Sequence, residues 1–386
     1  MKLASAGEVN PCASPILRFL QVHGSCDFTV RTGCRAANQP APTVRSDSRI
    51  LSVCRYGASM IFPTLLRVLV ALTSIGWLSQ RLQADSADST HVRSLKITIL
   101  STMLADGPSL GEWGFSALVE ADGHRILFDT GAHEDLVRRN ADALKIDLTT
   151  VPEVVLSHFH SDHTTGFLPL RRSVMTAHPT ALARTHVGRG IFFSRPLAST
   201  GAEDNPMVGA KPQYEREGGV FIEHSGPVQL YPGVWLTGPV PRKYPERNWS
   251  GHSRVVTPEG TVDDTLPEDI SLSCDTDAGL VVLTGCGHAG AINIIDYARQ
   301  IVRPVRVHAL IGGLHLFNAS EETLRWTGER LREFGVDYFL GGHCTGVETV
   351  YRFRHDLNLD RAHAVVAATG ATFTLGEGIN PGLIAR

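Results

Sequence analysis

A short segment with three histidines and one aspartate, placed directly after an apolar run, constrains this chain more than any other feature. Residues 157–166 read Ser-His-Phe-His-Ser-Asp-His-Thr-Thr-Gly and follow Val-Val-Leu, which has the composition of a buried strand. Side chains two residues apart in a strand point to the same side, so His158 and His160 can converge on one metal ion. Asp162 and His163 follow where the chain turns and can reach a second ion. Because imidazole and carboxylate are ligands of divalent metals, the segment favours a two-metal site over a polar turn.

Other strand ends carry side chains that could complete such a site. Each follows an apolar segment, and most lie between glycines, which let the backbone approach an ion closely; they are Asp129, Cys286, His288, His315 and His343. Asp129 could orient a ligating imidazole, although an Asx turn before a helix accounts for it equally well. His343 is a stronger ligand candidate than His315, which leucines flank on both sides as in a core histidine. Repetition of one design at successive strand ends indicates that these loops face one rim.

The charge balance and the cysteine count narrow the function classes. With 36 basic and 39 acidic residues, the net charge of −3 gives no overall basic field, so no nucleic-acid partner is expected. The seven cysteines are an odd number without paired spacing, which does not describe a disulfide framework. Cys286 and Cys344 each lie beside a histidine in a glycine-rich loop, so nearness to metal explains them better than a disulfide.

The N-terminal part differs in composition from the rest. Residues 1–59 mix Ser, Arg, Pro, Gly and Cys without periodicity, and little stable structure is expected there. An apolar stretch at 61–78, interrupted by Arg67, makes 60–90 similar to a secretory signal or a membrane anchor with a linker. Because a signal peptide does not begin so far into a chain, one hypothesis is that translation starts at Met60 and that 1–59 is a mis-called extension. An exported, periplasmic or membrane-anchored location is favoured over a cytoplasmic one, and an uncleaved 61–78 segment would be the membrane contact.

Residues 91–386 are expected to form one α/β domain. Apolar alternation and short apolar runs predict strands, and helical periodicity predicts helices. The predicted strands are 95–100, 115–121, 125–129, 154–157, 279–284, 307–311 and 337–340, and those at 115–121 and 125–129 are expected to form a hairpin across the Ala-Asp-Gly-His turn at 121–124. The predicted helices are 133–144, 290–302 and 320–335, and 364–368 is expected to form a closing hairpin with 372–375. The Gly- and Pro-rich segment 167–275, with short strands at 219–222 and 234–237, is interpreted as a large insertion whose loops shape a substrate pocket. Two α/β halves with His-bearing strand ends predict two packed sheets with helices outside.

Together these residues resemble the metallo-β-lactamase superfamily, whose signature metal loop is His-x-His-x-Asp-His. Further motifs resemble one branch of it, the dihydropterin–ribofuranosylaminobenzene phosphate synthase-like group; they are Glu112-Trp113-Gly114-Phe115-Ser116, Ile126 to Gly131, Thr284 to Gly290, Gly312 to Leu316 and His343 to Gly346. The resemblance runs from about Leu95 to Leu375 and implies an αββα sandwich of two mixed sheets with metals at the sheet edges. It implies that one ion is bound by His158, His160 and His288, and the other by Asp162, His163 and His343, with a bridging hydroxide. Cys286 stands where many members place a bridging acid.

The resemblance further implies a dinuclear metal-dependent hydrolase or transferase for a small substrate, which could be phosphorylated and pterin-like. In this interpretation a metal-bound hydroxide attacks, or the ions stabilise a leaving group. Asp162 and Asp129 are the candidate catalytic carboxylates, and Cys286, His315 and Trp113 are candidates for contact with the ligands or the substrate. Zinc is the favoured metal, with manganese or iron as alternatives. The alternative function is a non-catalytic, metal-dependent ligand-binding or sensor protein.

Overall fold

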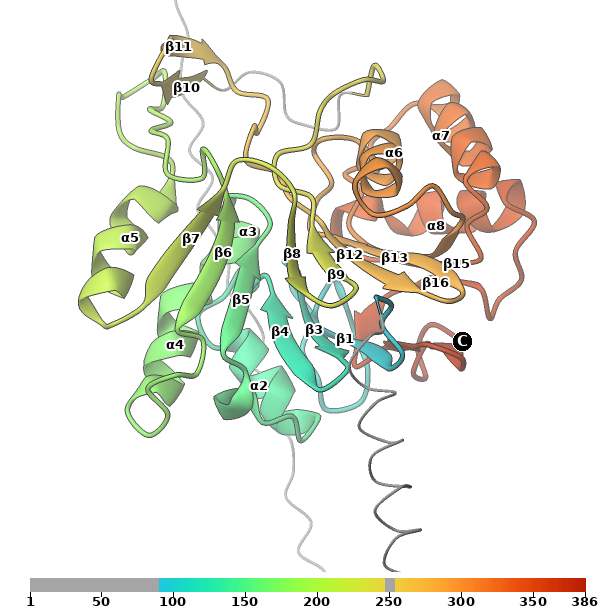
Figure 1. Cartoon of the computed structure of the whole chain (residues 1–386), viewed down its shortest axis with the longest axis horizontal. Helices are drawn as coiled ribbons and strands as arrows, with labels where there is room; N and C mark the ends of the chain where they lie inside the picture. Colours follow the sequence, from blue (N-terminus) through green and yellow to red (C-terminus); the bar gives the residue numbers. More distant parts are fainter. Residues whose placement is uncertain (1–89, 247–253) are drawn as a thin grey trace, which may run out of the picture. The chain divides into compact units, whose positions relative to one another are not determined.

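The computed structural model describes residues 90–246 and 254–386, which form two β-sheets packed face to face with helices on both outer sides (Figure 1). The predictions made for 1–89, including the apolar 61–78 segment, lie outside the described residues. Within the described ranges, no helix is both long enough and apolar enough to cross a membrane.

The first sheet has eight strands in the order β19-β18-β1-β3-β4-β5-β6-β7 among the described residues. Their bounds are β1 Leu95–Ser101, β3 Ser116–Ala121, β4 His124–Phe128, β5 Glu153–Leu156, β6 Arg184–Gly188, β7 Val220–His224, β18 Thr372–Thr374 and β19 Gly378–Asn380. The predicted hairpin of β3 and β4 is confirmed: Ala121 pairs with His124 across Asp122-Gly123, whose φ angles of 47° and 86° suit a tight two-residue turn. From β4 to β7 the neighbouring strands are parallel, so their carboxyl ends lie along one edge.

The second sheet has seven strands in the order β16-β15-β14-β13-β12-β9-β8, counted over the same residues. Their bounds are β8 Val228–Tyr231, β9 Val234–Leu236, β12 Leu272–Thr276, β13 Gly279–Thr284, β14 Val307–Gly312, β15 Tyr338–Gly341 and β16 Ala364–Val366. Strands β13 to β16 are parallel and also end along one edge. In the described ranges, two short pairs lie outside the large sheets: β2 (Leu104–Ala105) with β17 (Ala368–Thr369), and β10 (Arg254–Thr257) with β11 (Gly260–Asp263).

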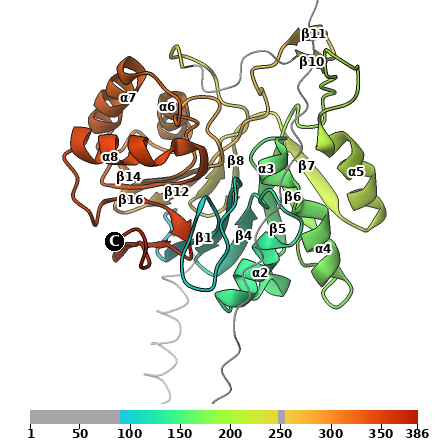
Figure 2. The same cartoon turned by 180° about the vertical axis from the view of Figure 1, so that it is seen from behind.

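The helices form the two outer layers, as both views show (Figures 1 and 2). Those on the first sheet are α2 Leu136–Ala143, α4 Phe167–Met175 and α5 Pro206–Arg216; those on the second are α6 Ala291–Ile301, α7 Glu321–Glu333 and α8 Val347–Asp356; short turns are α3 Ser161–Thr164, η1 Leu148–Thr150 and η2 His343–Thr345. One apolar core lies between the sheets, with Phe128 and Leu283 among its members. A second core joins the second sheet to α6–α8, and a third joins the first sheet to α2, α4 and α5. The predicted αββα sandwich is confirmed.

Two expectations about the chain path need correction. The end of the chain does not form a hairpin of 364–368 with 372–375, because β16 joins β15 in the second sheet whereas β18 pairs with β1 in the first. The segment 167–275 is not a peripheral insertion as a whole, since β6 and β7 belong to the first sheet and β8, β9 and β12 to the second. Short apolar runs show that a segment is a strand but not which strand it pairs with.

Candidate metal centre

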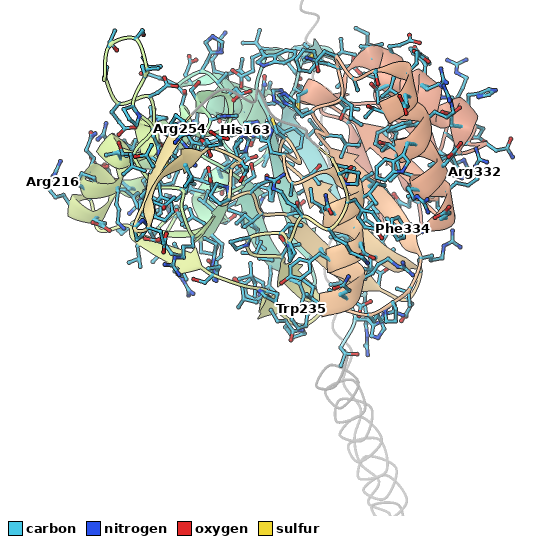
Figure 3. The ribbon with its side chains drawn as sticks, turned by 90° about the horizontal axis from the view of Figure 1, so that it is seen from above. His163, Arg216, Trp235, Arg254, Arg332 and Phe334 are labelled. Atoms are coloured by element: carbon cyan, nitrogen blue, oxygen red, sulfur yellow. The ribbon has the colours of Figure 1, made fainter. Side chains whose placement is uncertain are left out.

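Loops at the carboxyl ends of parallel strands in both sheets bring the predicted site residues together. Asp129 follows β4, the 158–163 segment follows β5, and Cys286 with His288, His315 and His343 follow β13, β14 and β15 in turn. His158 and His160 lie just past the end of β5, in the loop rather than in the strand. His163 lies near the middle of the described part, between the green and the orange halves (Figure 3). The site therefore forms where the edges of the two sheets meet.

Six candidate ligands predicted from the sequence fall into two neighbouring groups. His158, His160 and His288 each offer a ring nitrogen, and these atoms lie within 4.8 Å of one another. The Nε2 atom of His158 is 3.0 Å from Nδ1 of His160. These are the three residues that the resemblance assigned to one ion, and the structure places them as one group.

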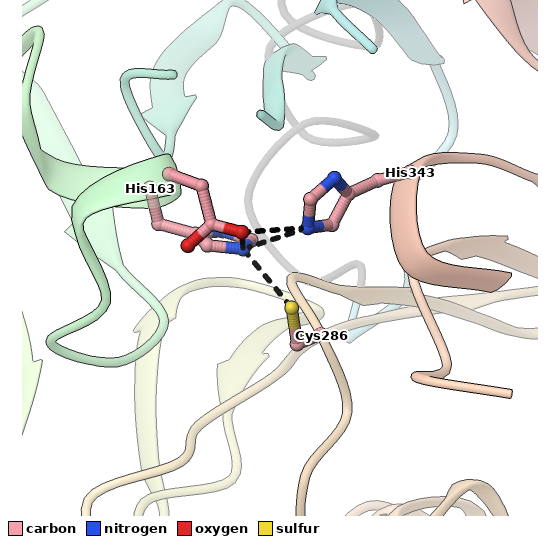
Figure 4. A group of neighbouring side chains, drawn as sticks. His163, Cys286 and His343 are labelled. Carbon is pink, nitrogen blue, oxygen red and sulfur yellow. Dashed lines mark hydrogen bonds and ion pairs between the residues drawn. The ribbon is translucent and has the colours of Figure 1, made fainter. Parts of the chain in front are cut away.

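The second group consists of Asp162, His163 and His343, with Cys286 beside them (Figure 4). Oδ2 of Asp162 is 3.2 Å from Nε2 of His343, and the Nε2 atoms of His163 and His343 are 3.3 Å apart. The three donors come from α3 and from η2, so this group links the two sheets.

A buried carboxylate behind the first segment fixes its geometry. Oδ2 of Asp129 is 2.7 Å from Nδ1 of His163, and the same carboxylate accepts hydrogen bonds from the backbone N–H and the hydroxyl of Ser157, both at 2.7 Å. The Ser157 hydroxyl also lies 2.9 Å from Nδ1 of His158. Because Asp129 and Ser157 engage the Nδ1 atoms, the Nε2 atoms of both histidines point toward the two groups of donors. Asp129 thus has the partner expected of an orienting carboxylate, and its side chain is fully buried.

Close packing of backbones holds the second strand-end loop against the first. A side chain at Gly285 would overlap the Ser157 hydroxyl and come within 2.7 Å of Asp129. Gly287, with φ 61°, then turns the chain, so that Cys286 and His288 both face the histidines of the first segment.

The donor set suits divalent cations. Burial lowers the pKa of His158 well below its ordinary value and that of His160 to about 4, so both imidazoles are neutral, which is the form that binds metal. Burial would raise the pKa of Asp162, but the charge of His163 and a hydrogen bond with His343 hold it below its usual range. Burial would lower the pKa of His163, but the Asp129 carboxylate raises it. Buried imidazoles facing one another around an anionic carboxylate make a suitable site for positive charge.

Aromatic side chains border the second group. Trp113 is 48% exposed, with its ring centroid 5.1 Å from that of His343 and 5.4 Å from that of Phe317, which is also 48% exposed. The ring of Phe317 lies 5.3 Å from that of His315, which in turn lies 4.6 Å from that of His288. Trp113 and His315, both predicted as contact candidates, therefore lie beside the candidate ligands.

Sequence reasoning missed three contributors. Ser157 directly precedes His158, so its position was a usable signal, but the sequence did not predict that its hydroxyl contacts Asp129 and His158. Phe317 follows His315 by two residues and was not singled out, although an aromatic residue in a His-bearing loop is a usable signal. Glu112 is nearly buried, and its carboxylate accepts hydrogen bonds from the Ser101 hydroxyl at 2.5 Å and the Ala132 backbone N–H at 3.0 Å. No local pattern identifies this last role, because its partners come from distant loops.

The comparisons with known proteins agree with this architecture. Residues 114–241 match the metallo-beta-lactamase superfamily. The 7,8-dihydropterin-6-methyl-4-(beta-D-ribofuranosyl)-aminobenzene-5'-phosphate synthase of Methanocaldococcus jannaschii is 27% identical over 290 residues, which cover 71% of this chain and 96% of that protein. An uncharacterized protein of the same organism is 26% identical over 279 residues, covering 69% and 97%. A crystal structure of a metal-dependent hydrolase of the beta-lactamase superfamily superposes with a TM-score of 0.55 at 26% identity, covering 69% of this chain and 94% of that one.

Fold, strand-end histidines and sequence match together define a protein with a metallo-β-lactamase domain, a fold of metal-dependent hydrolases. Within that class the chain is similar to the aminobenzene-5'-phosphate synthase of Methanocaldococcus jannaschii named above, over 96% of that protein's length.

Proposed function

We propose that this protein is a dinuclear metal-dependent enzyme that hydrolyses or transfers a group of a small, flat, aromatic substrate carrying a phosphate or diphosphate. The observation that carries the proposal is the pair of donor groups, His158-His160-His288 and Asp162-His163-His343, formed by loops of two different sheets. Structural metal sites are usually single and closed by four ligands, whereas paired sites beside an accessible rim serve catalysis.

The proposed ligands are the six residues of these two groups, with zinc favoured and manganese or iron as alternatives. Two divalent ions held there would lower the pKa of water toward neutrality and stabilise negative charge on a phosphoryl or carbonyl oxygen. Asp129 and Ser157 keep the imidazoles of His163 and His158 in the orientation that presents Nε2. Asp162, whose side chain is 21% exposed, and His160 are the two proposed ligands that are only partly buried, so they can also reach solvent and substrate.

The aromatic residues support a flat substrate. Exposed Trp and Phe rings bind planar rings by stacking or edge contacts. The loop that carries Trp113 is fixed on both sides, because Glu112 binds Ser101 and Ala132, and the backbone N–H of Phe115 donates to the carbonyl of Asp162 at 3.2 Å. A ring resting on Trp113 would lie next to His343 and Phe317. The name of the synthase relative includes a pterin and an aminobenzene, which are rings of this kind.

The first test measures metal and turnover on the same preparation. Purified protein stripped with a chelator and reloaded with zinc, manganese or iron should bind two equivalents by elemental analysis. It should then turn over at least one of a panel containing phosphodiesters, aryl phosphates, lactones, β-lactams, aryl esters, and a pterin methyl diphosphate with an arylamine acceptor. His160→Ala should lose metal and activity, whereas the exposed His178→Ala serves as the matched control and should keep both. Two bound ions with no turnover on any class would instead support the ligand-binding or sensor alternative.

A further inference from the structure

The sulfur atom of Cys286 lies between the candidate ligands rather than in an apolar core. Its Sγ is 3.1 Å from Nε2 of His163, and it lies within 4.8 Å of the donor atoms of Asp162 and His343. It also lies within 4.8 Å of the donor atoms of His288 and His315. Cys286 is therefore shared by two of the donor clusters among the described residues, and Figure 4 shows its thiol directed at His163.

Cys274 provides an internal comparison. Both thiols are buried, but Cys274 belongs to the apolar core between the sheets, among residues such as Val281 and Leu272. Cys286 belongs to none of the apolar clusters and is surrounded by imidazole and carboxylate groups. A buried thiol that packs against nitrogen and oxygen donors is placed for ligation rather than for apolar packing.

A second sulfur supports this position. Sγ of Cys344 is 3.2 Å from Sγ of Cys286 and can donate a hydrogen bond to it, while the backbone N–H of His315 points to Cys344 Sγ at 3.2 Å. A hydrogen bond from Cys344 would orient the sulfur of Cys286 as a ligand. Cys344 itself belongs to none of the donor clusters found in the described residues.

We propose that Cys286 is a sulfur ligand of the ion held by Asp162, His163 and His343, completing a set of four donors. The inference rests on the dinuclear site proposed above. On binding, the thiol loses its proton to solvent and the thiolate bonds to the metal, with no change in oxidation state. Because thiolate is a soft donor, it favours zinc and cobalt over manganese and magnesium at this position. The metal preference of the site is then set by a residue outside the His-x-His-x-Asp-His segment.

Two measurements on the full chain test the assignment without using activity. X-ray absorption at the zinc edge of the unmodified protein should show a sulfur neighbour at ~2.3 Å in addition to nitrogen and oxygen. Cobalt-loaded protein should show a sulfur-to-cobalt charge-transfer band in the near ultraviolet together with visible d–d bands. In Cys286→Ser the charge-transfer band should disappear while the d–d bands remain, and zinc affinity should fall at least about tenfold while manganese affinity stays unchanged.

The controls separate the assignment from its alternatives. Cys274→Ala should keep the band, because its thiol lies in the core. A band that survives in Cys286→Ser, or that is lost only in Cys344→Ser, overturns the proposal. An X-ray absorption spectrum at the zinc edge that shows no sulfur neighbour also overturns the proposal. Because this spectrum is measured on the unmodified protein, the result does not depend on whether a variant folds. Unmodified protein that takes up no cobalt or zinc would overturn the dinuclear site itself, whereas two bound ions without sulfur would overturn only the role of Cys286.

Discussion

Asp129 and His163 form a fully buried pair, with the carboxylate oxygen 2.7 Å from Nδ1 of the imidazole. The two residues come from loops after neighbouring parallel strands, β4 and β5. The contact fixes the imidazole of His163 to the edge of the first sheet. Its Nε2 atom then faces Asp162, His343 and Cys286.

The first prediction follows from that pair. Asp129→Asn should weaken binding of one of the two ions by roughly 10- to 100-fold, because the amide orients His163 less strongly and lacks the negative charge. Asparagine tolerates the φ of 56° found at this position, so the substitution adds no backbone strain. Competition with a chromophoric chelator measures the affinity. Ser157→Ala is the companion variant, and unchanged affinity in Asp129→Asn would contradict the role of the carboxylate.

A second prediction concerns the close approach of the two strand-end loops. Gly285→Ala should lower the free energy of unfolding by about 1–3 kcal/mol, because the new methyl group overlaps Ser157 and crowds Asp129. Metal binding should weaken with it. Gly209→Ala, at an exposed position of α5 with open space around it, should instead stabilise the protein by ~0.5–1 kcal/mol. Urea unfolding of the two variants measures both effects, and equal stabilities would show that the loops do not meet as described.

A third prediction concerns the buried arginine beside the metal loop. Arg195 is ion-paired with Asp264 at 2.6 Å and Glu268 at 2.7 Å, and its guanidinium lies 3.9 Å from the ring centroid of Phe159. Arg195→Met should cost about 3–5 kcal/mol, because it leaves two buried carboxylates without their partner. Arg172→Met, which breaks a more exposed pair with Glu217, should cost about 0–1 kcal/mol. Denaturant titrations that give similar losses for both would refute the structural role of Arg195.

A fourth prediction concerns pH. His224, at the end of β7, lies 2.9 Å from Nδ1 of His186, which binds Glu153 near Arg184 and Tyr231. Burial, and then the charge of His186, lower the pKa of His224 from 6.5 to about 4. The folded protein therefore binds this proton less readily than the unfolded chain, so its contribution to stability is present above pH 6.5 and is lost as pH falls toward 4. His224→Gln should lose less stability between pH 7 and pH 5 than the unmodified protein, as measured by unfolding at both pH values; an identical loss would contradict the assignment.

A fifth prediction tests the aromatic rim. Trp113→Ala should raise KM for aryl substrates by roughly three- to tenfold, because a stacking contact is lost, while metal content stays at two ions. Substrates without a ring should be unaffected. Steady-state kinetics with a matched pair of aryl and alkyl substrates measure the change in KM. Tyr351→Ala removes an exposed aromatic residue on α8 and serves as the control. An equal rise in KM for both substrates would show that Trp113 supports the fold and does not contact the aromatic ring of the substrate.

The sequence predicted those parts of the molecule that depend on local pattern. The 157–166 segment, the strand-end histidines and the hairpin at 121–124 each combine a short-range signal with a clear physical reason. The helix starting after Ser320 is another example, since Ser320 accepts a hydrogen bond from the Thr323 backbone N–H as a capping residue does.

The features that the sequence did not predict depend on contacts between segments that are far apart along the chain. β6 reads Arg-Thr-His-Val-Gly, which has little apolar character, although it is an interior strand of the first sheet. Its pairing with β5 and β7 is a tertiary effect, and this is why the 167–275 segment looked like an insertion. The sequence did not predict the roles of Ser157 and Glu112 for the same reason, because each depends on a partner in another loop.

His163 is separated from Cys286 by 123 residues and from His343 by 180 residues along the chain. During synthesis the first segment therefore leaves the ribosome long before its partners exist. An ion arriving at that stage could be held only by the residues of one loop, and full coordination has to wait until the second sheet has folded onto the first. For the ligand sets proposed above, a complete site therefore exists only after the second half has been made and folded, and a bound metal would report that both halves have been completed and joined.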